Sequence, residues 1–212
     1  MGSMSPLPNS ENVEVFQPAT SKLFAWTCWA VSAFGIVVSV LYGGTAVFAG
    51  VVPLLFVAYL GWLLFWRPAV IVSDAGVILE NPFRVVEVPW EALVQVDTRY
   101  SLTLVTPRRK YSAWAAPAPG IWGGRNAHPD HLRGLPESSY GPGKSVRPGD
   151  LKSTDSGAAA QIVRTRWQQL LASGGVESGR AEEAQVRSDV VWSRIAVAVI
   201  LAVAGYAAIL MS

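Results

Sequence analysis

Three long apolar stretches constrain this chain more than any other feature of its sequence. They cover residues 23–42, 45–66 and 190–211, and Arg194 is the only residue with a formal charge in any of them. About 20 apolar residues, at a rise of 1.5 Å per residue, are needed to cross the roughly 30 Å hydrocarbon core of a bilayer. Each stretch therefore predicts a transmembrane helix, and the sequence predicts an integral membrane protein with a polar region between its second and third spans.

The positions of the charges predict how the chain crosses the membrane. Only Gly43 and Gly44 separate the first two spans and only Ser212 follows the third, so all 17 basic residues fall on the opposite side or at its border. The positive-inside rule places that side in the cytoplasm. We therefore expect a multi-pass protein of the cell membrane, with a cytoplasmic N-terminus and polar region and with its C-terminus outside. Arg194, one turn inside the third span, can snorkel toward the headgroups, so we assign it no role in a pore.

The interior of the spans is typical of an anchor rather than of a transporter. Apolar residues dominate it, without the intramembrane carboxylates, histidines or amides that line transport pathways. Small residues recur four apart, at Gly35, Ser39 and Gly43 and at Ala198 and Ala202, and such rows let helices approach closely. We expect them to pack the three helices together, although a homodimer would use the same rows.

The period of the sequence changes completely after the second span. Between residues 67 and 116, short β-branched or alternating runs follow one another every 8–12 residues, which is typical of an antiparallel meander that closes into a barrel or sandwich. The expected strands are residues 69–72, 77–81, 84–88, 93–99, 101–106 and 110–115, with a turn at residues 89–92.

A set of short motifs in this region resembles a known family. They are Arg67-Pro68-Ala69-Val70-Ile71-Val72, Gly76-Val77, Asn81-Pro82, Val88-Pro89-Trp90, Leu102 and Ala113-Trp114-Ala115-Ala116-Pro117. Over roughly residues 20–117 the chain resembles the bacterial PH-like domain of small actinobacterial membrane proteins, in which two spans precede the first strand. The resemblance implies a bent antiparallel barrel that is capped by an amphipathic C-terminal helix, and a role in binding rather than catalysis.

A candidate for the capping helix lies at residues 156–173. Its apolar residues recur at helical spacing, at Ala160, Val163, Trp167, Leu170 and Leu171, and leave Arg164, Arg166, Gln168 and Gln169 on the other face. The resemblance implies that Trp167 anchors this helix, although any large apolar side chain would bury such a face.

The remaining segments predict little structure. Residues 117–155 are rich in Pro, Gly and Ser and have almost no aliphatic side chains, so they are expected to form a flexible loop. Residues 1–22 are expected to be a disordered N-terminus, and residues 174–189 a polar linker before the third span.

The sequence offers little catalytic chemistry. Its only cysteine, Cys28, lies in the first span, and it has no phosphate-binding glycine loop and no nucleophile elbow. His128, Asp130 and His131 could hold a metal ion, but they lack the helical spacing that preorganises ligands. A net charge of +2 without a basic arm argues against a nucleic-acid partner. We therefore expect no enzyme, no cofactor and no metal.

The basic residues suggest a different partner, the lipid headgroup. The first hairpin turn, residues 73–76, is acidic, but a later basic group comprises Arg99, Arg108, Arg109 and Lys110. Near an anionic leaflet each such charge contributes on the order of 1 kcal/mol. An ordinary charged turn that keeps a strand end soluble would look the same.

Together these features predict membrane helices with an all-β PH-like barrel and a capping helix. By resemblance, the cytoplasmic domain would bind or scaffold another membrane protein, or a peptide laid against a barrel edge. The alternative is a module that senses anionic lipids through the basic group.

Overall fold

The computed structural model describes residues 12–119, 150–151, 153–175 and 181–211, and these residues form two compact units. One unit is helical and consists of residues 18–68, 82–84 and 190–211. The other contains nearly all of the strands, one helix and the remaining described residues.

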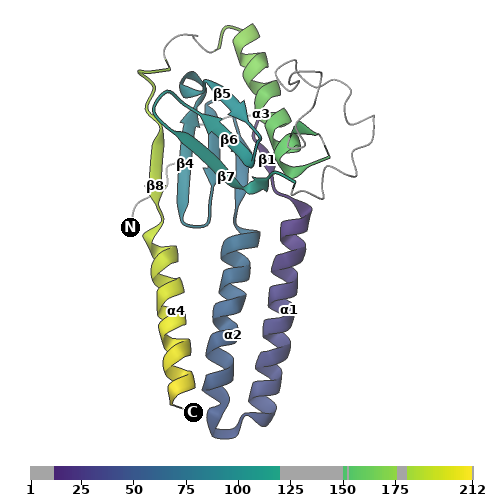
Figure 1. Cartoon of the computed structure of the whole chain (residues 1–212), viewed down its shortest axis with the longest axis vertical. Coiled ribbons are helices and arrows are strands. Elements are labelled where there is room, and N and C mark those ends of the chain that lie inside the picture. Colours follow the sequence, from purple (N-terminus) through teal and green to yellow (C-terminus); the bar gives the residue numbers. More distant parts are fainter. Residues whose placement is uncertain (1–11, 120–149, 152, 176–180, 212) are drawn as a thin grey trace. The chain divides into compact units, whose positions relative to one another are not determined.

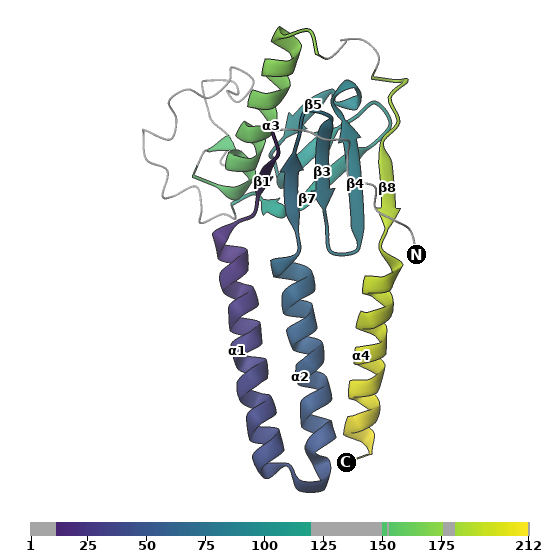
Figure 2. The same cartoon turned by 180° about the vertical axis from the view of Figure 1, so that it is seen from behind.

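The helical unit contains α1 (Ala19–Tyr42), α2 (Val47–Gly61) and α4 (Trp192–Leu210). A π-helical turn, Trp62–Trp66, continues α2, so that the apolar helix runs from Val47 to Trp66. All three helices are long and apolar enough to cross a membrane, as the sequence predicted. Within this unit α2 lies between α1 and α4 (Figures 1 and 2).

Small residues allow α1 and α2 to approach closely. A Cβ atom on Gly61 would lie 2.7 Å from Cys28 Cβ, one on Gly35 would lie 2.7 Å from Leu54 Cδ1, and one on Gly50 would overlap the Ser39 hydroxyl. Gly35 and Ser39 therefore belong to the contact between the two helices, as their spacing predicted. The contact of α4 is looser, because a Cβ atom on Gly205 would lie 3.5 Å from the Pro53 nitrogen.

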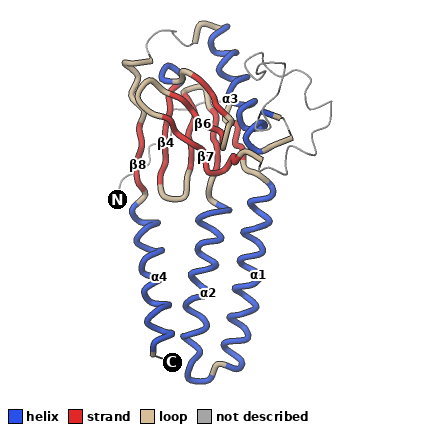
Figure 3. The backbone as a smooth tube through the Cα atoms, in the orientation of Figure 1, coloured by secondary structure: helices blue, strands red, loops and turns tan. Residues whose placement is uncertain are grey.

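The strand unit consists of two antiparallel sheets and a helix (Figure 3). In the first sheet the strand order is β1-β2-β3-β4-β8, and Figure 2 shows β3, β4 and β8 side by side. In the second the order is β5-β6-β7. The strand bounds are β1 Glu14–Phe16, β2 Ala69–Val72, β3 Gly76–Glu80, β4 Arg84–Pro89, β5 Gln95–Asp97, β6 Ser101–Val105, β7 Lys110–Pro117 and β8 Arg187–Val190.

The six strands expected after the second span are β2 to β7, and the predicted fold class is confirmed. Alternation in β6 buries Leu102 and Leu104, as a half-buried strand requires. The apolar core of the unit includes Val70, Val72, Leu79, Val86, Trp90, Leu102, Leu104, Ala113, Ala159, Ala160 and Val163.

The turn between β2 and β3 depends on one glycine and one tryptophan. Gly76 has φ +156°, and a Cβ atom there would overlap the carbonyl oxygen of Val88. Trp90, in a 3₁₀ turn and 1% exposed, donates a hydrogen bond of 2.9 Å from Nε1 to the carbonyl oxygen of Ser73. The turn expected at residues 89–92 therefore also closes this hairpin.

Two strands lie where the sequence indicated none. β1 lies in the segment expected to be disordered, and β8 lies in the expected linker, so both expectations are wrong for these residues. β1 forms because it pairs with β2 in register, Phe16 opposite Val70, and because Phe16 packs against the core. Edge strands this short carry little local signal, since their partners are distant in sequence.

The expected capping helix is α3, Asp155–Ala172. The side chain of Thr154 caps it by accepting a hydrogen bond of 3.1 Å from the backbone nitrogen of Gly157. One face of α3 packs on the core through the fully buried Ala159, Ala160 and Val163. The helix is followed by Gly174, whose φ of +72° suits the residue that ends a helix.

Arg194 has a hydrogen-bond partner that the sequence did not indicate. Its side chain is buried, and Nη1 donates a hydrogen bond of 3.2 Å to the carbonyl oxygen of Pro82. Pro82, at the tip of the β3–β4 hairpin, belongs to the helical unit and offers the guanidinium a nearby acceptor.

Two glycine substitutions test the helix contacts. We expect Gly61→Ala to lower the free energy of unfolding by about 1–2 kcal/mol, because overpacking outweighs the gain in helix propensity. Gly205→Ala, where the added methyl group has room, is the matched control and should be neutral or stabilising. Thermal unfolding in nanodiscs measures both, and an equally stable Gly61→Ala protein would contradict the tight α1–α2 contact.

Candidate functional site

A groove with a volume of about 360 Å³ runs between β5 and α3. One wall is the strand with its flanks, from Val94 to Thr98, and the other is α3. The α3 residues that line the groove are Arg164, Trp167, Gln168 and Leu171, and Asp150 from the segment before the helix completes the lining. β5 is an outer strand of its sheet, and it lies near α3 (Figure 1).

The floor of the groove is a buried polar network. Asp150 is 4% exposed, and its Oδ1 accepts a hydrogen bond of 2.7 Å from the Thr98 hydroxyl and an ion-paired hydrogen bond of 3.0 Å from Arg164 Nη1. Arg164 Nη2 donates a further hydrogen bond of 3.0 Å to the carbonyl oxygen of Val96. The guanidinium therefore joins α3 to β5 and to the segment that precedes α3.

The rim of the groove is apolar. Val94 is 51% exposed and Leu171 is 38% exposed, and Trp167 lies partly buried between rim and core. The groove therefore combines an apolar rim with a floor whose charges are paired.

The structure adds to the roles expected of α3. Trp167 packs against the core and also lines the groove, and its role as the anchor of the helix stays a prediction. Arg164 and Arg166, which the helical pattern placed on the polar face, both bind the strand unit. Arg166 Nη1 lies 3.4 Å from Asp74 Oδ1, and Nη2 donates a hydrogen bond of 3.2 Å to the carbonyl oxygen of Asn12.

The basic residues predicted to meet lipid do not form one cluster. Arg108, Arg109 and Lys110 lie in and after the β6–β7 turn, where the two arginines line a cavity of about 390 Å³ together with Tyr111 and residues 181 and 184–186. Arg99 precedes β6 and contacts the ring of Tyr100 at 5.2 Å from the centroid. The five residues of β6, about 17 Å long, separate Arg99 from the others.

The candidate metal ligands His128, Asp130 and His131 lie outside the described residues. Within the part of the chain that the structure describes, no three His, Cys, Asp or Glu side chains gather in a way that could hold a metal ion.

Comparison with known proteins agrees with this architecture. Residues 67–150 match the family model of the bacterial PH domain, a range that starts just before β2 and ends at the groove residue Asp150. No curated protein and no solved structure matches the chain. Together with the antiparallel sheets and α3, the match shows a PH-like domain in a chain that also has three helices able to span a membrane.

The polar network makes a clear prediction about stability. Asp150→Ala should lower the free energy of unfolding by about 3 kcal/mol, because it leaves the largely buried Arg164 guanidinium without its counter-charge. In Asp150→Ala with Arg164→Met the loss should be smaller, since no unpaired charge remains. Chemical unfolding of the reconstituted protein measures both, and a double variant less stable than Asp150→Ala would rule out this account.

Proposed function

We propose that this chain is a non-catalytic, membrane-anchored binding protein whose PH-like domain captures an extended segment of another protein. The partner is a membrane protein or a peptide, and the binding site is the groove between β5 and α3. The proposed orientation follows the basic residues, which favour a cytoplasmic domain and N-terminus, with the C-terminus across the cell membrane.

The observation that carries the proposal is the combination of an outer strand and an apolar rim. Exposed Val94 and Leu171 line the groove together with partly buried Trp167, so an apolar side chain could be desolvated there. Aromatic side chains in such positions often dominate binding energies. The charges at the floor, Asp150 and Arg164, already compensate each other and stabilise the domain.

Two valines that are equally exposed provide a matched test. Val94 and Val13 are each 51% exposed, but only Val94 lines the groove. Val94→Glu should weaken partner binding at least about tenfold, because the partner would have to bury a carboxylate. Val13→Glu adds the same charge outside the groove and should leave the affinity unchanged.

The measurement begins with native mass spectrometry of the protein in nanodiscs made from its own membrane, which identifies a partner of fixed stoichiometry. The affinity of each variant for that purified partner then follows from titration. Equal affinities of Val94→Glu and the unaltered protein would reject the groove as the binding site.

A second function, the sensing of anionic lipids, is favoured by one observation. Arg108 and Arg109 line the cavity beside the β6–β7 turn, where two guanidinium groups could share one phosphate. Because Arg99 lies at the other end of β6, this version of the proposal uses only Arg108, Arg109 and Lys110.

Charge reversal separates a lipid site from a soluble turn. In nanodiscs of mixed anionic and zwitterionic lipid, Arg108→Glu with Arg109→Glu should reduce the anionic lipid retained in native mass spectra by about tenfold or more, since each charge contributes about 1 kcal/mol. Arg99→Glu should leave retention nearly unchanged. Equal retention in all three proteins would favour the ordinary charged turn.

A further inference from the structure

The tip of the β3–β4 hairpin belongs to the helical unit rather than to the strands on either side of it. Residues Pro82–Arg84 cluster with the three apolar helices. The backbone nitrogen of Val191 donates a hydrogen bond of 2.9 Å to the carbonyl oxygen of Phe83, and Arg194 donates to the carbonyl oxygen of Pro82. The tip is therefore bound to the first turn of α4.

A contact with α2 shows where along the length of α2 the first turn of α4 lies. The Tyr59 hydroxyl donates a hydrogen bond of 2.9 Å to the carbonyl oxygen of Arg194. Tyr59 precedes Trp66, the end of the apolar helix, by seven residues, or about 10 Å. The first turn of α4 therefore lies alongside the last turns of α2 rather than beyond them.

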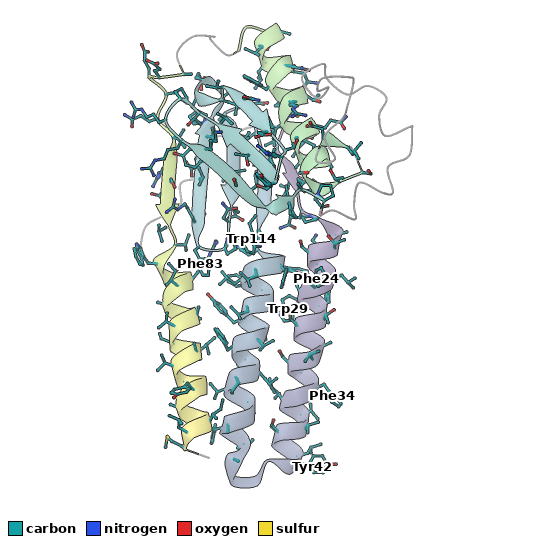
Figure 4. All side chains as sticks on the ribbon, in the orientation of Figure 1. Phe24, Trp29, Phe34, Tyr42, Phe83 and Trp114 are labelled. Carbon is teal, nitrogen blue, oxygen red and sulfur yellow. The ribbon has the colours of Figure 1, made fainter. Side chains whose placement is uncertain are left out.

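A cluster of tryptophans marks the same level. The rings of Trp26, Trp29 and Trp66 lie 5.1–6.1 Å apart, and Trp29 Nε1 donates a hydrogen bond of 3.1 Å to the carbonyl oxygen of Ala58, next to Tyr59. Tryptophans gather where hydrocarbon meets headgroups. Figure 4 shows Phe24, Trp29 and Phe83 at one end of the helical unit, with Phe34 and Tyr42 toward the other.

The side chains at the tip suit the headgroup region. Phe83 is 41% exposed although it is fully apolar, Arg84 beside it is exposed, and Trp192 at the start of α4 is 72% exposed. An aromatic ring next to a cation is the combination that the interface favours, because the ring enters the acyl boundary while the guanidinium stays among phosphates.

Two hydrogen-bonding side chains hold the hairpin on either side of the tip. Arg194 is a positioning residue, since its guanidinium binds the carbonyl oxygen of Pro82. On the strand side, Asn81 Nδ2 donates a hydrogen bond of 3.0 Å to the carbonyl oxygen of Ser112, and Asn81 Oδ1 accepts one of 2.7 Å from the nitrogen of Trp114.

From these observations we infer that Pro82–Arg84 is a membrane-contact element, a hairpin tip that inserts Phe83 into the headgroup region of the bilayer. The occupant of this exposed aromatic surface is lipid. The inference is independent of the groove between β5 and α3, because it concerns residues that the groove does not include.

A depth measurement on labelled cysteines tests the inference. Because Cys28 is the only cysteine, Cys28→Ser gives a background in which Phe83→Cys is labelled with an environment-sensitive fluorophore in proteoliposomes. Leu55→Cys, 45% exposed on α2, serves as the deep control, and Tyr100→Cys, 77% exposed before β6, as the aqueous control. Quenchers are lipids spin-labelled at shallow or deep acyl positions, and iodide in water.

The label at position 83 should be quenched at least twofold more by the shallow lipid than by the deep lipid, and less by iodide than the label at position 100. Quenching like that at position 100 would overturn the inference, as would quenching like that at position 55. If Phe83→Cys does not fold, the exposed Arg84→Cys carries the label instead.

Variants of Arg194 provide a second measurement, which would not change if Arg194 only stabilised the fold. Arg194→Met removes the donor to Pro82 and should shift the label at position 83 toward iodide quenching, while the label at position 55 stays unchanged. Arg194→Lys keeps a donor and should restore shallow quenching. Identical quenching in Arg194→Met and the parent would show that Arg194 does not position the tip.

Discussion

The cap of the strand unit depends on the ion pair between Arg164 and Asp150. The α3 side chains that are fully buried in the core are small, Ala159, Ala160 and Val163, while the larger Trp167 and Leu170 are only partly buried against it. The removal of two charges from water costs several kcal/mol for each ion, but here Thr98 and the carbonyl oxygen of Val96 satisfy further hydrogen bonds. The same contacts that hold α3 against β5 therefore set the width of the groove.

Much of the architecture could be predicted because its signals are local. A membrane span requires about 20 consecutive apolar residues, and a half-buried strand requires the alternation seen at Leu102 and Leu104, so both patterns can be recognised within a short stretch of sequence. The capping helix was predictable for the same reason, since Val163 and Trp167 recur at helical spacing. Half of the groove was thus foreseen as one face of a helix, although nothing indicated that Leu171 would remain at its rim.

The features that could not be predicted depend on contacts between distant residues. Asp150 lies in a segment rich in proline and glycine, and the neighbouring residues do not indicate that its partners are Thr98 and Arg164. The acceptor of Arg194 could not be predicted either, because Pro82 is 112 residues away in the sequence. Arg99 and Arg108 were assigned to one basic group because they are close in the sequence, but the length of β6 separates them in the structure.

The order of strands in the five-stranded sheet has a consequence for synthesis. Its two edges, β1 and β8, come from near opposite ends of the described chain, and both lie outside the range that matches the bacterial PH domain. β1 leaves the ribosome before α1 and α2, so its partner β2 does not yet exist. β8 emerges only after the rest of the sheet is complete. The β1 edge can therefore form as soon as β2 is synthesised, whereas the edge at β4 stays open until β8 emerges, just before α4.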